Sequence, residues 1–174
     1  LYAGAPIHLT NIGFLDDSFW TQIKNWKIAH LPGVPFHYSA LRRYGFSNID
    51  LPQLRVLTQA GGALDPKIRK MAYEFMDSIN GRFHVMYGQT EAAPRLTTLS
   101  HEDFLDNPLS VGKALPGGRI EIQNKGQISE TGVEGDIIYY GENVMMGYAE
   151  CPEDLSKGNV QKNTLITGDI GFLD

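Results

Sequence analysis

The chain has 174 residues and a formal net charge of -5, and 42% of its residues are hydrophobic and 20% are charged. These values are typical of a folded globular protein, so they exclude a chain that is disordered over most of its length. No apolar run reaches the ~18 residues that a membrane-spanning helix needs. The single cysteine, Cys151, excludes an internal disulfide framework. We therefore expect a cytoplasmic protein without a transmembrane segment.

The charge is distributed unevenly along the chain. Residues 1–87 carry nine Lys and Arg against six Asp and Glu, whereas residues 88–174 carry six against fourteen. A nucleic-acid surface requires a clustered basic face, which the acidic second half does not offer. We expect no nucleic-acid partner, and a solvated acidic surface is the simpler interpretation.

The first part of the chain alternates between strand and helix patterns. Residues 6–10 predict a strand, and a helix follows with Asp16 or Asp17 as its N-cap and a buried face of Phe19, Trp20, Ile23 and Trp26. Further elements are predicted at 30–31 (extended), 34–44 (helix), 54–59 (strand), from 65–66 (helix) and at 83–87 (strand). The helix near Asp65 should bury Ile68, Met71, Ala72, Phe75 and Met76. This alternation predicts an α/β fold, with a largely parallel sheet flanked by helices.

After about residue 106 the elements become shorter and rich in Gly, Pro and Asn. Strands are predicted at 118–123, 135–140, 165–167 and 170–173, with a helix at 152–157. This pattern favours an antiparallel sheet or part of a smaller β-barrel. We place a domain boundary at 106/107, which gives a nucleotide- and acyl-binding part (1–106) and a barrel part (107–174). Both ends of the chain fall inside predicted structure, which suggests a piece of a longer protein.

Three segments follow predicted strands and carry candidate binding chemistry. Residues 58–64 contain paired glycines, which allow a flat ligand to approach the backbone. Residues 86–91, MYGQTE, place an aromatic ring, a hydroxyl and a carboxylate together, which suits a purine, a phosphate and Mg²⁺ respectively. Residues 165–169 end in an aspartate that could accept bonds from ribose hydroxyls. Each segment alone is also compatible with an ordinary turn.

Taken together and in this order, the segments resemble the large N-terminal domain of the adenylate-forming enzymes. The matching stretches are AGGAL, YGQTEA, VGKALPGG, GENVMMGYAE and TGDIGFLD, and the likeness covers essentially the whole chain. Gln89 and Val85 make it more similar to acyl-CoA synthetases than to peptide-synthetase adenylation domains, which usually have Pro and Asn at these positions. The resemblance implies ATP or AMP, Mg²⁺ and coenzyme A as cofactors.

The resemblance also implies roles for individual residues. Gly61, Gly62 and Ala63 would line the adenine and acyl pocket, and Tyr87 would pack against adenine. Gly88 and Gln89 would lie beside the carboxylate substrate. Thr90 would contact the phosphate of AMP, Glu91 would bind Mg²⁺, and Asp169 would hold the ribose hydroxyls.

The implied reaction joins a carboxylic acid to ATP and then transfers the acyl group to the thiol of coenzyme A. The alternatives are an adenylation domain that loads a carrier-protein pantetheine and a non-catalytic nucleotide-binding module. In the family, a phosphate loop precedes this region and a C-terminal lid domain with a lysine follows it. We therefore expect these 174 residues alone to be inactive and to associate with one another through surfaces that the rest of the protein would cover.

Overall fold

The computed structural model describes residues 4–174, which form two compact units divided between His84 and Val85. The α-helices in these residues are α1 (Asp17–Asn25), α2 (Pro35–Tyr44) and α3 (Pro66–Ser78), and the short 3-10 helices are η1 (Phe46–Asn48), η2 (Thr90–Ala92) and η3 (Pro152–Ser156). The strands are β1 (His30–Gly33), β2 (Val56–Gln59), β3 (Arg82–Tyr87), β4 (Thr97–Leu99), β5 (Lys113–Ala114), β6 (Arg119–Asn124), β7 (Gln127–Ile128), β8 (Gly135–Tyr140) and β9 (Thr164–Gly171).

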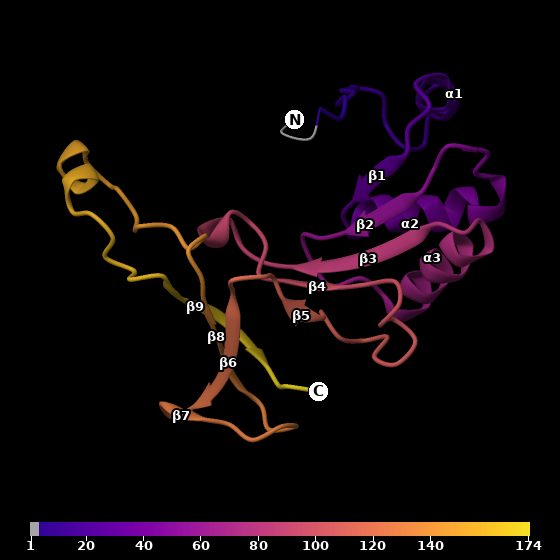
Figure 1. The fold of residues 1–174 in the computed structure, drawn as a ribbon. Coiled ribbons are helices and arrows are strands. Elements are labelled where there is room, and N and C mark those ends of the chain that lie inside the picture. The colour runs from indigo at the N-terminus through magenta and orange to yellow at the C-terminus, as the bar shows by residue number, and fades with distance from the viewer. Residues whose placement is uncertain (1–3) are drawn as a thin grey trace. The chain divides into compact units, whose positions relative to one another are not determined.

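The strands form two sheets (Figure 1), with orders β1-β2-β3-β4-β5 and β7-β6-β8-β9. In the first sheet, β1 pairs with β2 in parallel, while β4 is antiparallel to both β3 and β5. In the second sheet, the β6–β7, β6–β8 and β8–β9 pairs are antiparallel, and the sheet stays open among the described residues rather than closing into a barrel. The α/β class and the antiparallel second sheet are confirmed. The 106/107 domain boundary stays a prediction.

Two helices in the first unit, α1 and α3, begin at aspartate caps. The Asp16 side chain accepts a hydrogen bond from the Ser18 amide at 2.8 Å and starts α1, and Asp65 caps α3 in the same way, with Pro66 in the first turn. Phe19, Trp20 and Ile23 are buried, as predicted. Both α2 and α3 contact the sheet.

Three expectations for the first unit need correction. Residues 6–10 form no strand, and Ile7 and Leu9 are exposed, because an apolar pattern gives a strand only where a neighbouring strand can pair with it. Met71 is 38% exposed, since the buried side of α3 follows Ile68, Ala72 and Met76. Trp26 is only half-buried and stacks on His8.

Elements in the second unit differ mainly in length from the predicted ones. The predicted strands at 165–167 and 170–173 are one strand, β9, which continues past Gly168 with an irregular register against β8 near Asp136. The predicted helix at 152–157 is the 3-10 helix η3. Strands β4, β5 and β7 were not predicted, because two or three residues give no periodicity to detect.

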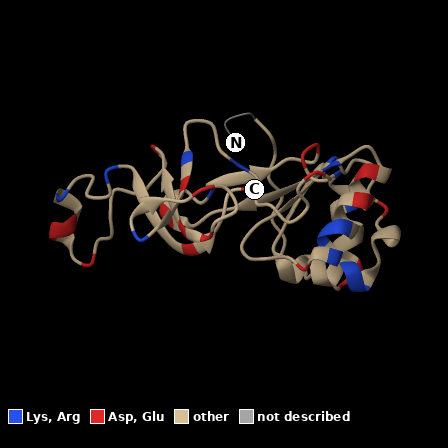
Figure 2. Cartoon of the chain, turned by 90° about the horizontal axis from the view of Figure 1, so that it is seen from below, with Lys and Arg blue, Asp and Glu red and all other residues tan. Residues whose placement is uncertain are grey.

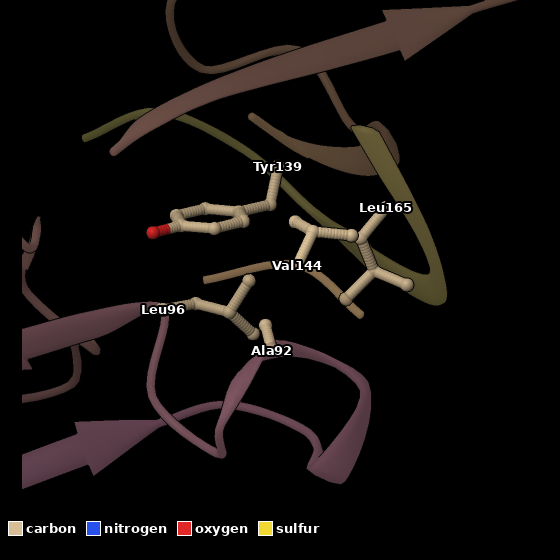
Figure 3. Packing of buried hydrophobic residues seen from close by; sticks show 5 residues of the cluster. All are labelled: Ala92, Leu96, Tyr139, Val144 and Leu165. Carbon is tan, nitrogen blue, oxygen red and sulfur yellow. The ribbon is translucent and has the colours of Figure 1, made fainter. Parts of the chain in front are cut away.

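The second unit has an apolar core that supports the turn after β3 (Figure 3). It consists of Ala92, Leu96, Tyr139, Val144 and Leu165, and Tyr87 and Ile120 pack against it. Ala92 and Leu96 are fully buried. The turn that follows β3 is therefore packed onto side chains from β8, β9 and the loop between them.

Figure 2 colours the positions of the charged residues on the ribbon. Basic residues gather along the helical ribbons, and acidic residues occur in both units. The α-helices all belong to the first unit. Residues 88–174, which lie in the second unit, carry six Lys and Arg against fourteen Asp and Glu, so an anionic ligand bound there would benefit from an accompanying cation.

Candidate functional site

Tyr87 ends strand β3 and contacts β9. Its backbone pairs with Thr97 of β4, and its ring packs against the second unit's apolar core. The Tyr87 hydroxyl donates a hydrogen bond of 2.7 Å to Oδ2 of Asp169. Two residues that the sequence placed in separate motifs are thus in direct contact.

Gln89 joins the same group from the loop that follows β3, two positions after Tyr87. Its Nε2 donates to the carbonyl oxygen of Thr167 at 2.7 Å and to Oδ2 of Asp169 at 3.1 Å. Thr167 in turn accepts from the Asp169 amide and donates to the Ile137 carbonyl of β8. The carboxylate is therefore held by the side chains of Tyr87 and Gln89 and by the local backbone of strand β9.

The arrangement leaves Asp169 able to bind a ligand. Tyr87 and Gln89 both donate to Oδ2, whereas an ionised carboxylate has about four acceptor sites over its two oxygens. The side chain is exposed. A diol, such as a ribose, could donate to Oδ1 without displacing either neighbour.

Tyr87 is a donor over the whole ordinary pH range. Burial raises the pKa of Tyr87 to about 12, and the neighbouring Asp169 carboxylate also raises it, while a hydrogen bond with Thr167 acts in the opposite direction. The phenol is therefore neutral at physiological pH. The direction of the Tyr87–Asp169 bond is fixed.

The Thr90–Glu91 pair lies on the short helix η2, directly after Gln89. Thr90 is exposed, and Glu91 is partly exposed. The Tyr148 hydroxyl donates to Oε1 of Glu91 at 2.7 Å, and this bond lowers the pKa of the Glu91 carboxyl. The turn thus presents a hydroxyl and an ionised carboxylate side by side.

Tyr148 and Thr167 are parts of this site to which the sequence assigned no role. Tyr148 is 57 residues from its partner Glu91, and Thr167 is 78 residues from Gln89. Both belong to stretches that matched the family pattern. No local periodicity signals a contact at such a separation.

Gly88 has a structural reason to be glycine. A Cβ at this position would lie 2.7 Å from Cα of Arg95 and 2.9 Å from the Leu96 nitrogen, and closer still to the Pro94 carbonyl oxygen. The backbone after β3 therefore folds back onto itself at this point. The predicted place of Gly88 and Gln89 beside a carboxylate substrate stays a prediction.

Gly61, Gly62 and Ala63 lie in the first unit and are exposed. They form the turn after β2, which positive φ angles of 75° at Gly61 and 143° at Gly62 allow. The Gln59 side chain donates to the Gly62 carbonyl at 2.7 Å. The turn is well defined, and the predicted lining of an adenine and acyl pocket stays a prediction.

The Thr90–Glu91 turn suits Mg²⁺ only if a bound nucleotide supplies most of the ligands. Residues 4–174 contain no group of three or more His, Cys, Asp or Glu that could hold a metal ion. Mg²⁺ often binds through one or two carboxylates and the phosphates of a substrate. The ionised, accessible Glu91 fits that mode, with the nucleotide supplying most of the oxygen ligands.

The comparisons with known proteins identify a family and its close structural neighbours. The family model described as AMP-binding enzyme matches residues 1–149. Oxalate–CoA ligase from Arabidopsis thaliana is 29% identical over 178 aligned residues, which cover all of this chain and 34% of the ligase.

Solved structures of o-succinylbenzoate coenzyme A synthetase from Bacillus subtilis have the same fold. The complex with ATP and magnesium ion has a TM-score of 0.72 and 26% identity, covering 90% of this chain and 32% of that one. The complex with the acyl-adenylate intermediate has a TM-score of 0.74 and 26% identity, covering 90% and 31%. The chain thus spans about a third of the length of these relatives.

Proposed function

Because the chain belongs to the family of AMP-binding enzymes, we propose that its second unit carries the nucleotide site of a carboxylate-activating acyl-CoA ligase. The observation that carries the proposal is the joint contact of Tyr87, Gln89 and Asp169, with the Thr90–Glu91 turn next to it. These residues combine a ring, a carboxylate for a diol, a hydroxyl and a second carboxylate. That set matches the successive parts of a nucleotide.

Each side chain has a distinct role in this proposal. The Tyr87 ring packs against adenine, and Asp169 accepts hydrogen bonds from the ribose hydroxyls. Thr90 donates its hydroxyl proton to an oxygen of the α-phosphate. Glu91 is the protein ligand of Mg²⁺, which supplies charge neutralisation at the phosphates when it is bound.

The proposed reaction has two steps. A carboxylate oxygen attacks the α-phosphorus of ATP, forming the acyl–phosphate bond, and pyrophosphate leaves with the electrons of the broken bond. The thiol of coenzyme A, after losing its proton, then attacks the acyl carbon and AMP leaves. Thr90 contributes where charge develops on the phosphate, which is where fixed donors lower a barrier most effectively.

Other parts of the proposal come from the relatives. The named relatives are CoA ligases or synthetases, which favours a small carboxylic acid as substrate and coenzyme A as acceptor. We further propose that these 174 residues bind nucleotide weakly and do not complete the reaction alone, and that the parent protein is cytoplasmic. No helix among residues 4–174 is long and apolar enough to cross a membrane.

A calorimetric titration tests the proposal directly. AMP and Mg·ATP are titrated into the chain and into Asp169→Asn, which removes the charge and keeps the shape. Weak, saturable binding that Asp169→Asn reduces supports the proposed site. Equal binding by both proteins would place the nucleotide elsewhere.

A further inference from the structure

The loop that follows β8 is joined to the turn that carries Thr90 and Glu91. Asn143 lies between the two segments. Its Nδ2 donates to the carbonyl oxygen of Ala92 at 2.7 Å and to that of Arg95 at 3.0 Å. Both protons of the amide are therefore used on one turn, some 50 residues earlier in the chain.

The Asn143 amide is itself fixed from the other side. Its Oδ1 accepts a hydrogen bond of 2.8 Å from the hydroxyl of Tyr139, whose side chain is almost fully buried. Figure 3 shows the Tyr139 ring in the apolar cluster with Ala92 and Val144. The amide thus has little freedom to turn away from the two carbonyls.

A second bond from the same loop reaches Glu91 itself. The Met145 amide donates to the Glu91 carbonyl oxygen at 2.7 Å. The turn needs such support, because Ala93 has a left-handed φ of 55°, which a residue with a side chain adopts at an energetic cost. Packing of Ala92 against Val144 closes the contact on the apolar side.

We propose that Asn143 is a positioning residue that sets the geometry of the Thr90–Glu91 turn toward the phosphates and their metal ion. The inference rests on the proposed function and adds a residue that acts without touching the nucleotide. Only a primary amide can donate twice and accept once at this point. An aspartate keeps the shape but offers no donor to the two carbonyls.

The first arm of the test is amide hydrogen exchange, which needs no ligand. In Asn143→Asp, the amides of Ala92 and Ala93 in the turn, and of Met145 in the loop bonded to it, should exchange about tenfold faster, because the two segments lose two side-chain bonds. The amides paired between β6 and β8 should keep their rates. Asn124→Asp is the matched control. Asn124, on β6, also donates to a backbone carbonyl, that of Glu134.

The second arm compares two ligands. Asn143→Asp should weaken the binding of Mg·ATP about tenfold and leave the binding of adenosine unchanged, because adenosine has no phosphates for the turn to contact. A purely structural loss would weaken both ligands alike. Tyr139→Phe removes only the bond to Oδ1 and should give a smaller effect in the same direction, so it replaces Asn143→Asp if that variant does not fold.

The outcomes separate this inference from the proposed function. Faster amide exchange confined to the turn and its supporting loop, together with a loss of affinity for Mg·ATP but not for adenosine, supports the role of Asn143. Unchanged exchange rates in the turn overturn this inference. A uniform rise of the exchange rates in the turn, the loop after β8 and the β6–β8 pairs also overturns it. If the unaltered chain binds no nucleotide, the proposed function fails, and the exchange arm alone still decides whether Asn143 holds the turn.

Discussion

The Tyr87 hydroxyl donates to the Asp169 carboxylate over 2.7 Å and joins two residues that are 82 positions apart. The bond engages Oδ2 of the carboxylate, which also accepts a hydrogen bond from Gln89. One side chain comes from the end of β3 and the other from β9. The candidate site therefore depends on the packing of the second unit, and not on either segment alone.

Tyr87→Phe removes this bond and keeps the ring. We expect a loss of about 1 kcal/mol in the free energy of unfolding, since the bond is partly exposed to solvent, and weaker binding of AMP. Urea unfolding and calorimetry measure the two effects. Tyr140→Phe is the control, because Tyr140 also donates to a carboxylate, that of Glu121, at 3.0 Å.

The control should lose similar stability and keep its affinity for AMP. If Tyr140→Phe weakened AMP as strongly as Tyr87→Phe, the effect would report general destabilisation. The Tyr87–Asp169 pair would then have no special place in binding.

The titration of Tyr87 gives a second prediction. Burial, and then Asp169, raise the pKa of its phenol to about 12, so the neutral form is favoured in the folded state. The corresponding stabilisation is complete below the unfolded tyrosine pKa of about 10 and is lost as the pH rises toward 12. Carbon NMR of labelled tyrosine should show that the Tyr87 phenol titrates near pH 12.

Asp169→Asn should lower the Tyr87 pKa only in part, because burial is the larger cause. Tyr87→Phe identifies the signal. A Tyr87 resonance that titrates near pH 10 in the unaltered chain would contradict the burial of this ring.

The close packing around Gly88 predicts a large effect from a small substitution. Gly88→Ala places a Cβ against the backbone of Pro94, Arg95 and Leu96, none of which can move without deforming the turn. We expect a loss of about 1–3 kcal/mol, which is usual for overpacking. Gly13→Ala is the control, because a Cβ there meets nothing within 4 Å.

Hydrogen exchange near Thr97, or urea unfolding of the second unit, would measure the loss. Equal stability of Gly88→Ala and Gly13→Ala would show that the backbone after β3 has room for a side chain at position 88, against the close packing of Pro94, Arg95 and Leu96.

The exposed edge strand β9 leads us to expect that the chain associates with itself. It lies at the edge of the second sheet, and the side chains of Ile166 and Ile170 are 72% and 70% exposed. Exposed apolar edge strands favour pairing with another chain. Ile166→Lys should reduce the oligomer fraction seen by light scattering, whereas Leu155→Lys, an exposed position on η3, should not. A monomeric unaltered chain would contradict this prediction.

Much of the fold could be predicted from the sequence because its signals are local. The Asp16 and Asp65 caps and the buried face of α1 depend on neighbours within one or two helical turns. The failures have the opposite cause. Residues 6–10 lack a strand partner, and β9 runs through Gly168 because its pairing with β8 continues on both sides.

The candidate site shows the same division. Tyr87, Gln89, Thr90 and Glu91 stand together in one motif and could be predicted as a group. Tyr148 and Asn143 could not be assigned roles, because their partners lie about 50 residues earlier in the chain. Such contacts follow from the tertiary packing around Tyr139 and Val144.

The measurement that tests the central claim most directly is an NMR titration of the labelled chain with AMP, without and with Asp169→Asn. We predict saturable binding with a Kd of about 1 mM and a clear loss of affinity in the variant. The largest amide shifts should occur at residues 87–91 and 167–169. Shifts confined to other parts of the chain, or equal affinity in both proteins, would contradict the assignment of this group as the nucleotide site.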